Sequence, residues 1–219
     1  MNKVLISVFI IISLSKTSFA QSFLGAFSLG ANLSQVDGDE IYGFKKIGLN
    51  MGVAAFYPII QNKLYGSVEI SYSQKGAYQK YPLIADPASS LPYYSLYLNY
   101  LDIPFLIHLM DKRSLMLGTG ISYGRLVGMK EIEWGIIKNN SVFESPYIRE
   151  DWNFIVDVRI PIHNRFKFNF RYNYSLKKLR TRTYTNISGD EWNRDQFNNF
   201  LSFRLVYVFN EKIKPKNND

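Results

Sequence analysis

Strict alternation of aromatic and polar residues between positions 166 and 175 constrains the fold of this chain more than any other feature. Aromatic side chains occupy every second position and polar ones the positions between: Phe166, Phe168, Phe170, Tyr172 and Tyr174 alternate with Lys167, Asn169, Arg171, Asn173 and Ser175. A helix would spread the aromatics around its circumference, whereas an extended strand places all of them on one face. The segment therefore predicts a β-strand with one apolar and one polar face.

The same alternation recurs along the rest of the chain. It is found in segments 23–34, 47–55, 64–73, 100–109, 115–124, 152–162 and 201–209, which brings the number of predicted strands to eight. Most have about the 9–11 residues that a tilted strand needs to cross the hydrocarbon layer of a bilayer. Strands of a soluble β-sandwich usually have only about 5–6 residues. Strand length therefore favours a membrane protein over a sandwich.

The connections between these strands alternate between short and long. Short connections are expected at 58–63, 110–113 and 163–165, and long polar ones at 36–46, 74–93, 126–151 and 176–196. An antiparallel up-and-down transmembrane β-barrel has this pattern, with short periplasmic turns and long outer loops. A soluble lipocalin-like barrel, the main alternative, would put its apolar side chains inside and has no reason to alternate its loops. We therefore predict an all-β, eight-stranded outer-membrane barrel.

The first twenty residues have the organisation of a secretory signal peptide. Met1-Asn2-Lys3 is followed by an apolar run over 4–14 and by Ser18-Phe19-Ala20, a small-residue cleavage site. We predict a signal peptide at 1–20, the barrel at 21–209 and a polar periplasmic tail at 210–219. The protein is then expected in the outer membrane of a Gram-negative bacterium.

Composition agrees with export to a membrane. The chain has no Cys, so an exported domain must be stabilised by a core or a membrane instead of disulfides. Its mean hydropathy of −0.13 is too polar for a helical membrane protein, although aromatics reach 16%. The formal net charge is +8. Because export excludes nucleic acid, the expected anionic partners are outer-membrane lipids and lipopolysaccharide.

Six charged residues lie on the predicted polar faces at mid-strand: Glu69, Asp102, Asp157, Arg159, Arg171 and Arg204. The interior of an eight-stranded barrel is just wide enough for side chains to fill. Because isolated buried charge is very costly, these acids and arginines should pair across the lumen. The pattern predicts a structural plug, with a proton or ion path as the alternative.

The predicted fourth outer loop is basic. It contains Lys177, Lys178, Arg180 and Arg182. These are candidate contacts for lipopolysaccharide phosphates through charge-assisted hydrogen bonds. The alternative is that the loop is basic only because it is exposed to solvent. Aromatic residues near the strand ends are expected to form two interfacial girdles, with Tyr123 and Trp152 in the outer one.

The sequence predicts no catalytic residue, metal site or cofactor. Its two histidines are His163, in a predicted periplasmic turn, and His108, with Ser122 several residues further toward the outer rim. A lipid-modifying barrel enzyme needs a nucleophile, base and acid in hydrogen-bond reach, so it is the least favoured alternative. Asp37, Asp39 and Glu40 could meet a divalent cation, but a solvated acidic loop is expected.

Three segments resemble the PorT-type outer-membrane β-barrel family, which is widespread in Bacteroidota. They are Tyr100-Leu101-Asp102-Ile103-Pro104-Phe105, the glycine-rich run 118–124 and Leu205-Val206-Tyr207-Val208-Phe209. The resemblance covers about Phe23 to Phe209 and implies an eight-stranded barrel, without implying any catalytic residue. We expect a non-enzymatic structural or interaction protein whose loops contact lipopolysaccharide or a surface partner. The alternative is an accessory component of a protein secretion system, contacting other envelope proteins.

Overall fold

The computed structural model describes residues 23–41, 43–80, 94–111, 115–185 and 188–210. The predicted signal peptide and all but the first residue of the predicted tail lie outside these residues. The described residues form ten β-strands, β1 (Leu24–Asp37), β2 (Lys46–Ile60), β3 (Leu64–Gln79), β4 (Tyr94–Met110), β5 (Met116–Glu133), β6 (Ile136–Asn139), β7 (Glu150–His163), β8 (Phe166–Ser175), β9 (Arg180–Thr185) and β10 (Glu191–Val208). Among them there is no helix that is long and apolar enough to span a membrane.

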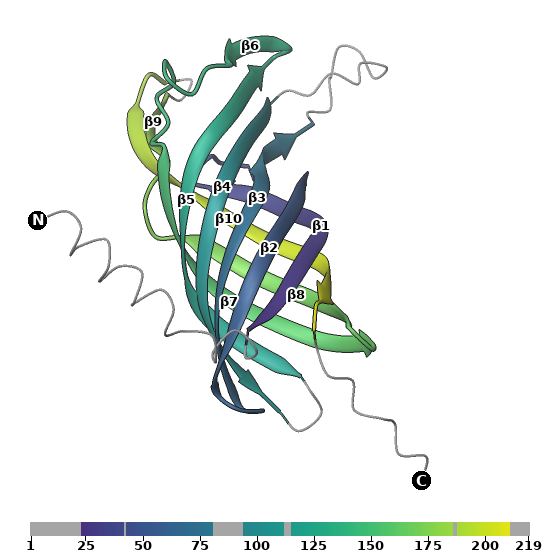
Figure 1. The fold of residues 1–219 in the computed structure, drawn as a ribbon. Helices are drawn as coiled ribbons and strands as arrows, with labels where there is room; N and C mark the ends of the chain where they lie inside the picture. The colour runs from purple at the N-terminus through teal and green to yellow at the C-terminus, as the bar shows by residue number, and fades with distance from the viewer. Residues whose placement is uncertain (1–22, 42, 81–93, 112–114, 186–187, 211–219) are drawn as a thin grey trace, which may run out of the picture.

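Eight of the strands form a closed antiparallel ring (Figure 1). Each of β1, β2, β3, β4, β5, β7, β8 and β10 pairs with the next, and β10 returns to pair with β1. The closing ladder runs from Ala26 opposite Val208 to Asp37 opposite Phe197. Closure leaves the ring without a free sheet edge. The prediction of an all-β, eight-stranded antiparallel barrel is confirmed.

The two remaining strands correct the prediction of two long loops. β6 forms a hairpin with the outer end of β5, and β9 forms one with the outer end of β10, within the predicted loops 126–151 and 176–196. In Figure 1, β6 and β9 lie at the upper end of the barrel, beyond the ring. The sequence pattern missed them because strands beyond the membrane need no lipid-facing apolar stripe. The outer end is therefore an ordered extension of the sheet.

At the opposite end the strands are joined by short turns. β2 joins β3 and β7 joins β8 through two short connections in which Asn62 and Asn164 have left-handed backbones, with φ of 60° and 45°. Asparagine adopts this conformation more readily than most residues, so it is suited to tight reversals between strands. These turns are the predicted short connections at 58–63 and 163–165.

The ring has an apolar outer wall and a polar inner wall. Phe27, Ile70 and Leu109 point outward and are 41%, 59% and 64% exposed, while Asn32, Ser73 and Asn169 point inward and are fully buried. Successive side chains of a strand point to opposite faces, so the apolar residues of the alternating pattern point outward and the polar residues point into the barrel. This is the arrangement that a barrel in hydrocarbon requires.

Candidate functional site

Glu69 lies in the middle of the barrel interior, between two arginines from the opposite wall. One oxygen, Oε2, accepts a hydrogen bond from Arg171 Nη2 at 2.9 Å, and Oε1 accepts one from Arg204 Nη1. Arg204 also donates to Asn169 Oδ1 from Nε and Nη2, at 2.8 and 2.6 Å. The three strands β3, β8 and β10 are thus linked across the lumen by charge-assisted hydrogen bonds.

Asp157 is the second carboxylate of this layer. Its Oδ1 accepts from Arg171 Nε at 2.7 Å, and its Oδ2 accepts from Arg159 Nε at 2.9 Å. Arg204 Nη2 lies 3.9 Å from the same carboxylate. Five of the six residues that the sequence singled out therefore belong to one network, which we call the middle layer (Glu69, Asp157, Arg159, Arg171 and Arg204).

The sixth residue, Asp102, lies apart from the middle layer. It pairs with Lys75 Nζ at 3.1 Å, and the same ammonium group lies 3.3 Å from Asp151 Oδ2. Lys75 Nζ also lies 4.3 Å from the ring centre of Tyr100. Asp102, Lys75 and Asp151 form a separate upper layer, whereas the sequence had suggested that Asp102 would pair with the arginines.

Lys75 and Asp151 were missed, although the sequence held a signal for both. Lys75 has the same parity as Glu69 on β3, and Asp151 the same parity as Asp157 on β7. The predicted strands ended at Ser73 and began at Trp152, which left both residues in loops. Extending the alternation by two residues past Ser73 and by one residue before Trp152 would have placed both of them inside.

Apolar clusters fill the interior on both sides of the charged layers. Toward the periplasmic end lie Ala26, Phe56, Tyr65, Met116, Val206 and Val208. Toward the outer end lie Val36, Ala77, Tyr94, Leu96, Leu98, Tyr100, Leu126, Met129, Val142, Tyr147 and Leu179. Phe56 meets the middle layer directly, because the Arg159 guanidinium lies 4.6 Å from its ring centre. In the described interior the two charged layers thus lie between two apolar clusters, and the outer cluster shares Tyr94 and Tyr147 with a further buried ion pair between Arg180 and Glu131.

The side chains of a serine, a histidine and an aspartate from three different strands lie next to one another at the edge of the middle layer. Ser67 Oγ lies 2.8 Å from His108 Nε2, and His108 Nδ1 lies 3.8 Å from Asp157 Oδ2. The second distance is too long for the hydrogen bond that orients a catalytic base, and all three side chains are buried. Ser122, which the sequence analysis considered, makes no hydrogen bond to His108. The arrangement offers no open nucleophile.

Arg180 holds the outer extension together. Its Nη2 donates to Glu131 Oε1 at 2.7 Å, and its Nε donates to Gln196 Oε1 at 2.8 Å. Tyr94 and Tyr147 donate to the same Glu131 oxygen at 3.1 and 3.0 Å. Burial alone would raise the pKa of Glu131, but the Arg180 guanidinium outweighs it and holds that pKa below its usual range. This buried network connects β4, β5, β9 and β10.

The four basic residues of the predicted fourth loop occupy different environments. Arg180 is buried in the network just described, so it is not available to a surface ligand. Arg182 is partly exposed and pairs with Glu133 at 2.7 Å. Lys177 and Lys178 have about two fifths of their side chains exposed, and they lie 3.6 Å from Glu150 and 3.1 Å from Asp195. The two lysines are therefore the most accessible of the four cations.

Asp39 is buried in the turn that follows β1. Its Oδ1 accepts a hydrogen bond from the Ile41 backbone N–H at 2.8 Å, while Oδ2 has no hydrogen-bond partner among the described residues. Burial, helped by nearby Asp37, raises the pKa of Asp39 to about 7. In the part of the chain that the structure describes, no group of three or more His, Cys, Asp or Glu side chains could hold a metal ion.

A closed antiparallel ring with an apolar outer wall and an ion-paired interior defines a transmembrane β-barrel of the outer-membrane class. The family model described as "Outer membrane protein beta-barrel domain" matches residues 19–180. The chain belongs to this family and is an outer-membrane protein. The match is to the general domain, so membership of the PorT-type family and an origin in Bacteroidota remain predictions.

Several solved outer-membrane proteins are similar to this chain in fold. Ail, the attachment invasion locus protein of Yersinia pestis, is 14% identical with a TM-score of 0.49, and the match covers 85% of this chain and 98% of Ail. Ail has also been solved with the heparin analogue sucrose octasulfate. Neisserial surface protein A is 11% identical with a TM-score of 0.44, covering 84% and 95% of the two chains. Among curated proteins, no sequence matches significantly.

Proposed function

We propose that this protein is a non-enzymatic outer-membrane barrel with a plugged lumen, which serves as a structural and interaction module at the cell surface. The observation that carries the proposal is the charge balance of the interior. The two charged layers hold four carboxylates, Glu69, Asp102, Asp151 and Asp157, and four cations, Lys75, Arg159, Arg171 and Arg204. Paired and hydrogen-bonded charges of this kind stabilise a filled interior.

A plug accounts for these contacts better than an ion path. A path needs water or mobile groups through the full height of the barrel, whereas apolar clusters flank the charged layers on both sides. Reconstitution of the protein into planar bilayers tests this directly. We expect no stable channel openings, and an ohmic conductance from the wild-type barrel would contradict the plug.

The outer end supports an interaction role. Its strands are held by the buried Arg180–Glu131 ion pair, while the side chains of Lys177 and Lys178, each paired with one carboxylate, stay about two fifths exposed. Ordered cations at the level of lipid headgroups are suited to lipopolysaccharide phosphates. Titration of purified lipopolysaccharide into phospholipid nanodiscs that hold the barrel should give saturable binding that weakens with salt. Binding no greater than that of empty nanodiscs would contradict this role.

A further inference from the structure

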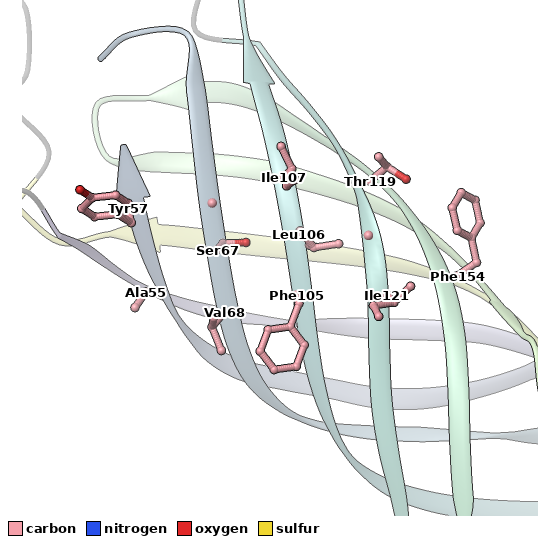
Figure 2. Close-up of a pocket in the computed structure, with 12 residues that line it drawn as sticks. Ala55, Tyr57, Ser67, Val68, Phe105, Leu106, Ile107, Thr119, Ile121 and Phe154 are labelled. Carbon is pink, nitrogen blue, oxygen red and sulfur yellow. The ribbon is translucent and has the colours of Figure 1, made fainter. Parts of the chain in front are cut away.

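A hollow lies in the lipid-facing wall of the barrel, across β2, β3, β4, β5 and β7 (Figure 2). It has a volume of about 670 Å³ and is lined mainly by outward-facing apolar side chains such as Phe105 and Ile107. On either side of Ile107, the facing positions are Gly66 on β3 and Thr119 on β5. The Thr119 hydroxyl donates to the Ile155 carbonyl at 2.9 Å, so it is already satisfied by the wall. The wall is therefore recessed beside Ile107, and the recess is apolar.

The recess lies close to the periplasmic ends of its strands. Gly66 is two residues after the start of β3 at Leu64, and Ile107 is three residues before the end of β4 at Met110. Along the strands these separations are about 7 and 10 Å, whereas one hydrocarbon leaflet is roughly 15 Å thick. Tyr57, which lines the hollow, has its ring centre 5.3 Å from that of Phe23, as expected of aromatic residues near a membrane interface. The recess is therefore within reach of lipids of the periplasmic leaflet.

Two exposed side chains of opposite charge lie at the periplasmic ends of the same two strands. Lys63 directly precedes β3 and Asp111 directly follows β4. The Met110 N–H donates to the Lys63 carbonyl at 2.8 Å, which places the two strand ends side by side. Among the described residues, neither charged side chain has an ion-pair partner. A free cation and a free carboxylate next to an apolar recess match the two charges and the tail of a zwitterionic phospholipid.

We propose that this part of the wall binds one zwitterionic phospholipid of the periplasmic leaflet, of the phosphatidylethanolamine type. Lys63 contacts its phosphate and Asp111 its ammonium group, through charge-assisted hydrogen bonds, and one acyl chain fills the recess beside Gly66. A second copy of the chain, packed symmetrically on this face, would set one hollow against the other and leave a void between them. The site goes beyond the proposed surface role, because it lies at the opposite end of the barrel from Lys177 and Lys178.

Native mass spectrometry of the full-length mature protein, released from detergent with added phospholipid, tests the headgroup contacts. The wild type should retain one phosphatidylethanolamine, and retain phosphatidylglycerol less well, because that lipid has no ammonium group for Asp111. Lys63→Ala should retain either lipid about tenfold more weakly, given one lost charge-assisted contact. Asp111→Asn should lose the preference for phosphatidylethanolamine. Arg165→Ala removes a partly exposed cation from the β7–β8 turn, so it is the matched control and should bind as the wild type does.

Filling the recess tests the acyl contact separately. A Cβ at Gly66 would make only an ordinary contact, 3.6 Å from Ile59 Cδ1, so Gly66→Leu should fold and occupy the recess. It should weaken retention of both phospholipids about tenfold, because the apolar surface that the acyl chain covers is lost, and keep the preference between them. Ala31→Leu enlarges a lipid-facing side chain on β1, opposite Phe203 and outside the hollow, and should leave retention unchanged.

Three results would overturn the site. The first is equal retention by the wild type, Lys63→Ala and Gly66→Leu, which would mean an unspecific shell of lipid. The second is a wild type without preference for phosphatidylethanolamine over phosphatidylglycerol. The third is a lipid-free dimer that Gly66→Leu dissociates, which would assign the hollow to a second copy. None of them would alter lipopolysaccharide binding in nanodiscs, which tests the proposed function on its own.

Discussion

Glu69 shows how strongly single residues inside the barrel depend on one another. It is 2% exposed and accepts hydrogen bonds from Arg171 and Arg204, on two other strands. If the carboxylate is removed, two guanidinium groups remain buried with fewer partners. The cost of uncompensated buried charge then exceeds the loss of the hydrogen bonds themselves.

Glu69→Ala should therefore lower the free energy of unfolding by about 3–5 kcal/mol. Urea unfolding of the refolded protein in lipid vesicles, followed by tryptophan fluorescence, measures the change. Asp195→Ala removes a carboxylate of an exposed ion pair on the outer hairpin and should leave the unfolding midpoint close to that of the wild type. Equal midpoints for Glu69→Ala and the wild type would show that the middle layer contributes little.

Asp39 should make the outer turn sensitive to pH. Its pKa of about 7 lies above the ordinary 3.8, so folding favours the protonated form. The resulting stabilisation is complete below about pH 4 and is lost as the pH rises through 7. Hydrogen exchange of residues 37–41, corrected for intrinsic rates, should be slower at pH 5.5 than at pH 8.

The variant Asp39→Asn should abolish this difference in exchange, because an amide does not titrate. Glu191→Gln changes an exposed carboxylate on the neighbouring hairpin and should preserve the difference. If the pH dependence persists in Asp39→Asn, another group is responsible for it.

At the scale of whole strands, the sequence predicted the membrane part of the barrel but underestimated how far several strands continue beyond their predicted outer ends. The eight predicted strands all exist, and the segment 166–175 coincides with β8. β4, β5 and β10, however, extend six, nine and ten residues beyond their predicted outer ends, at 100, 124 and 201. Hydrocarbon imposes strict alternation only where a strand crosses it, so the pattern ends at the interface although the strand continues.

For the charged residues of the interior, the sequence likewise indicated only those that lie in the membrane part of the strands. Inward parity identified all five members of the middle layer, because they lie within the hydrocarbon-spanning pattern. It could not establish which charges meet, since pairing depends on strand stagger and side-chain reach across the lumen. Asp102 is the example: it pairs with Lys75, which lies beyond the predicted outer end of the strand that contains Glu69.

Replacing Arg180 should loosen the outer extension without opening the barrel. Arg180→Leu leaves Glu131 buried without its guanidinium partner, so local opening of β9 and the outer end of β5 should become easier by about 1–3 kcal/mol. Hydrogen exchange in 131–139, 180–185 and 188–196 should rise, while exchange in β8 stays slow. Arg182→Leu removes a more exposed pair and should have a smaller effect. Equal acceleration throughout β8 would contradict a separately stabilised outer extension.

The distribution of polar and apolar side chains in the whole molecule is the reverse of that in a soluble protein. Its outer wall exposes large apolar side chains such as Phe154, Val156 and Ile160. Its interior buries ion pairs between two apolar clusters. This arrangement is stable only where hydrocarbon surrounds the barrel, because exposing the apolar outer wall to water is unfavourable in free energy.

The most direct test is a nitroxide accessibility scan along β7 in lipid vesicles, for which the absence of native Cys makes single-site labelling clean. Labels at Phe154, Val156 and Ile160 should collide frequently with oxygen, which partitions into hydrocarbon, and rarely with a water-soluble nickel chelate. Labels at Asn153 and Ile155 should be shielded from both. Greater access of the nickel chelate at Phe154, Val156 and Ile160 would contradict a barrel whose outer wall faces lipid.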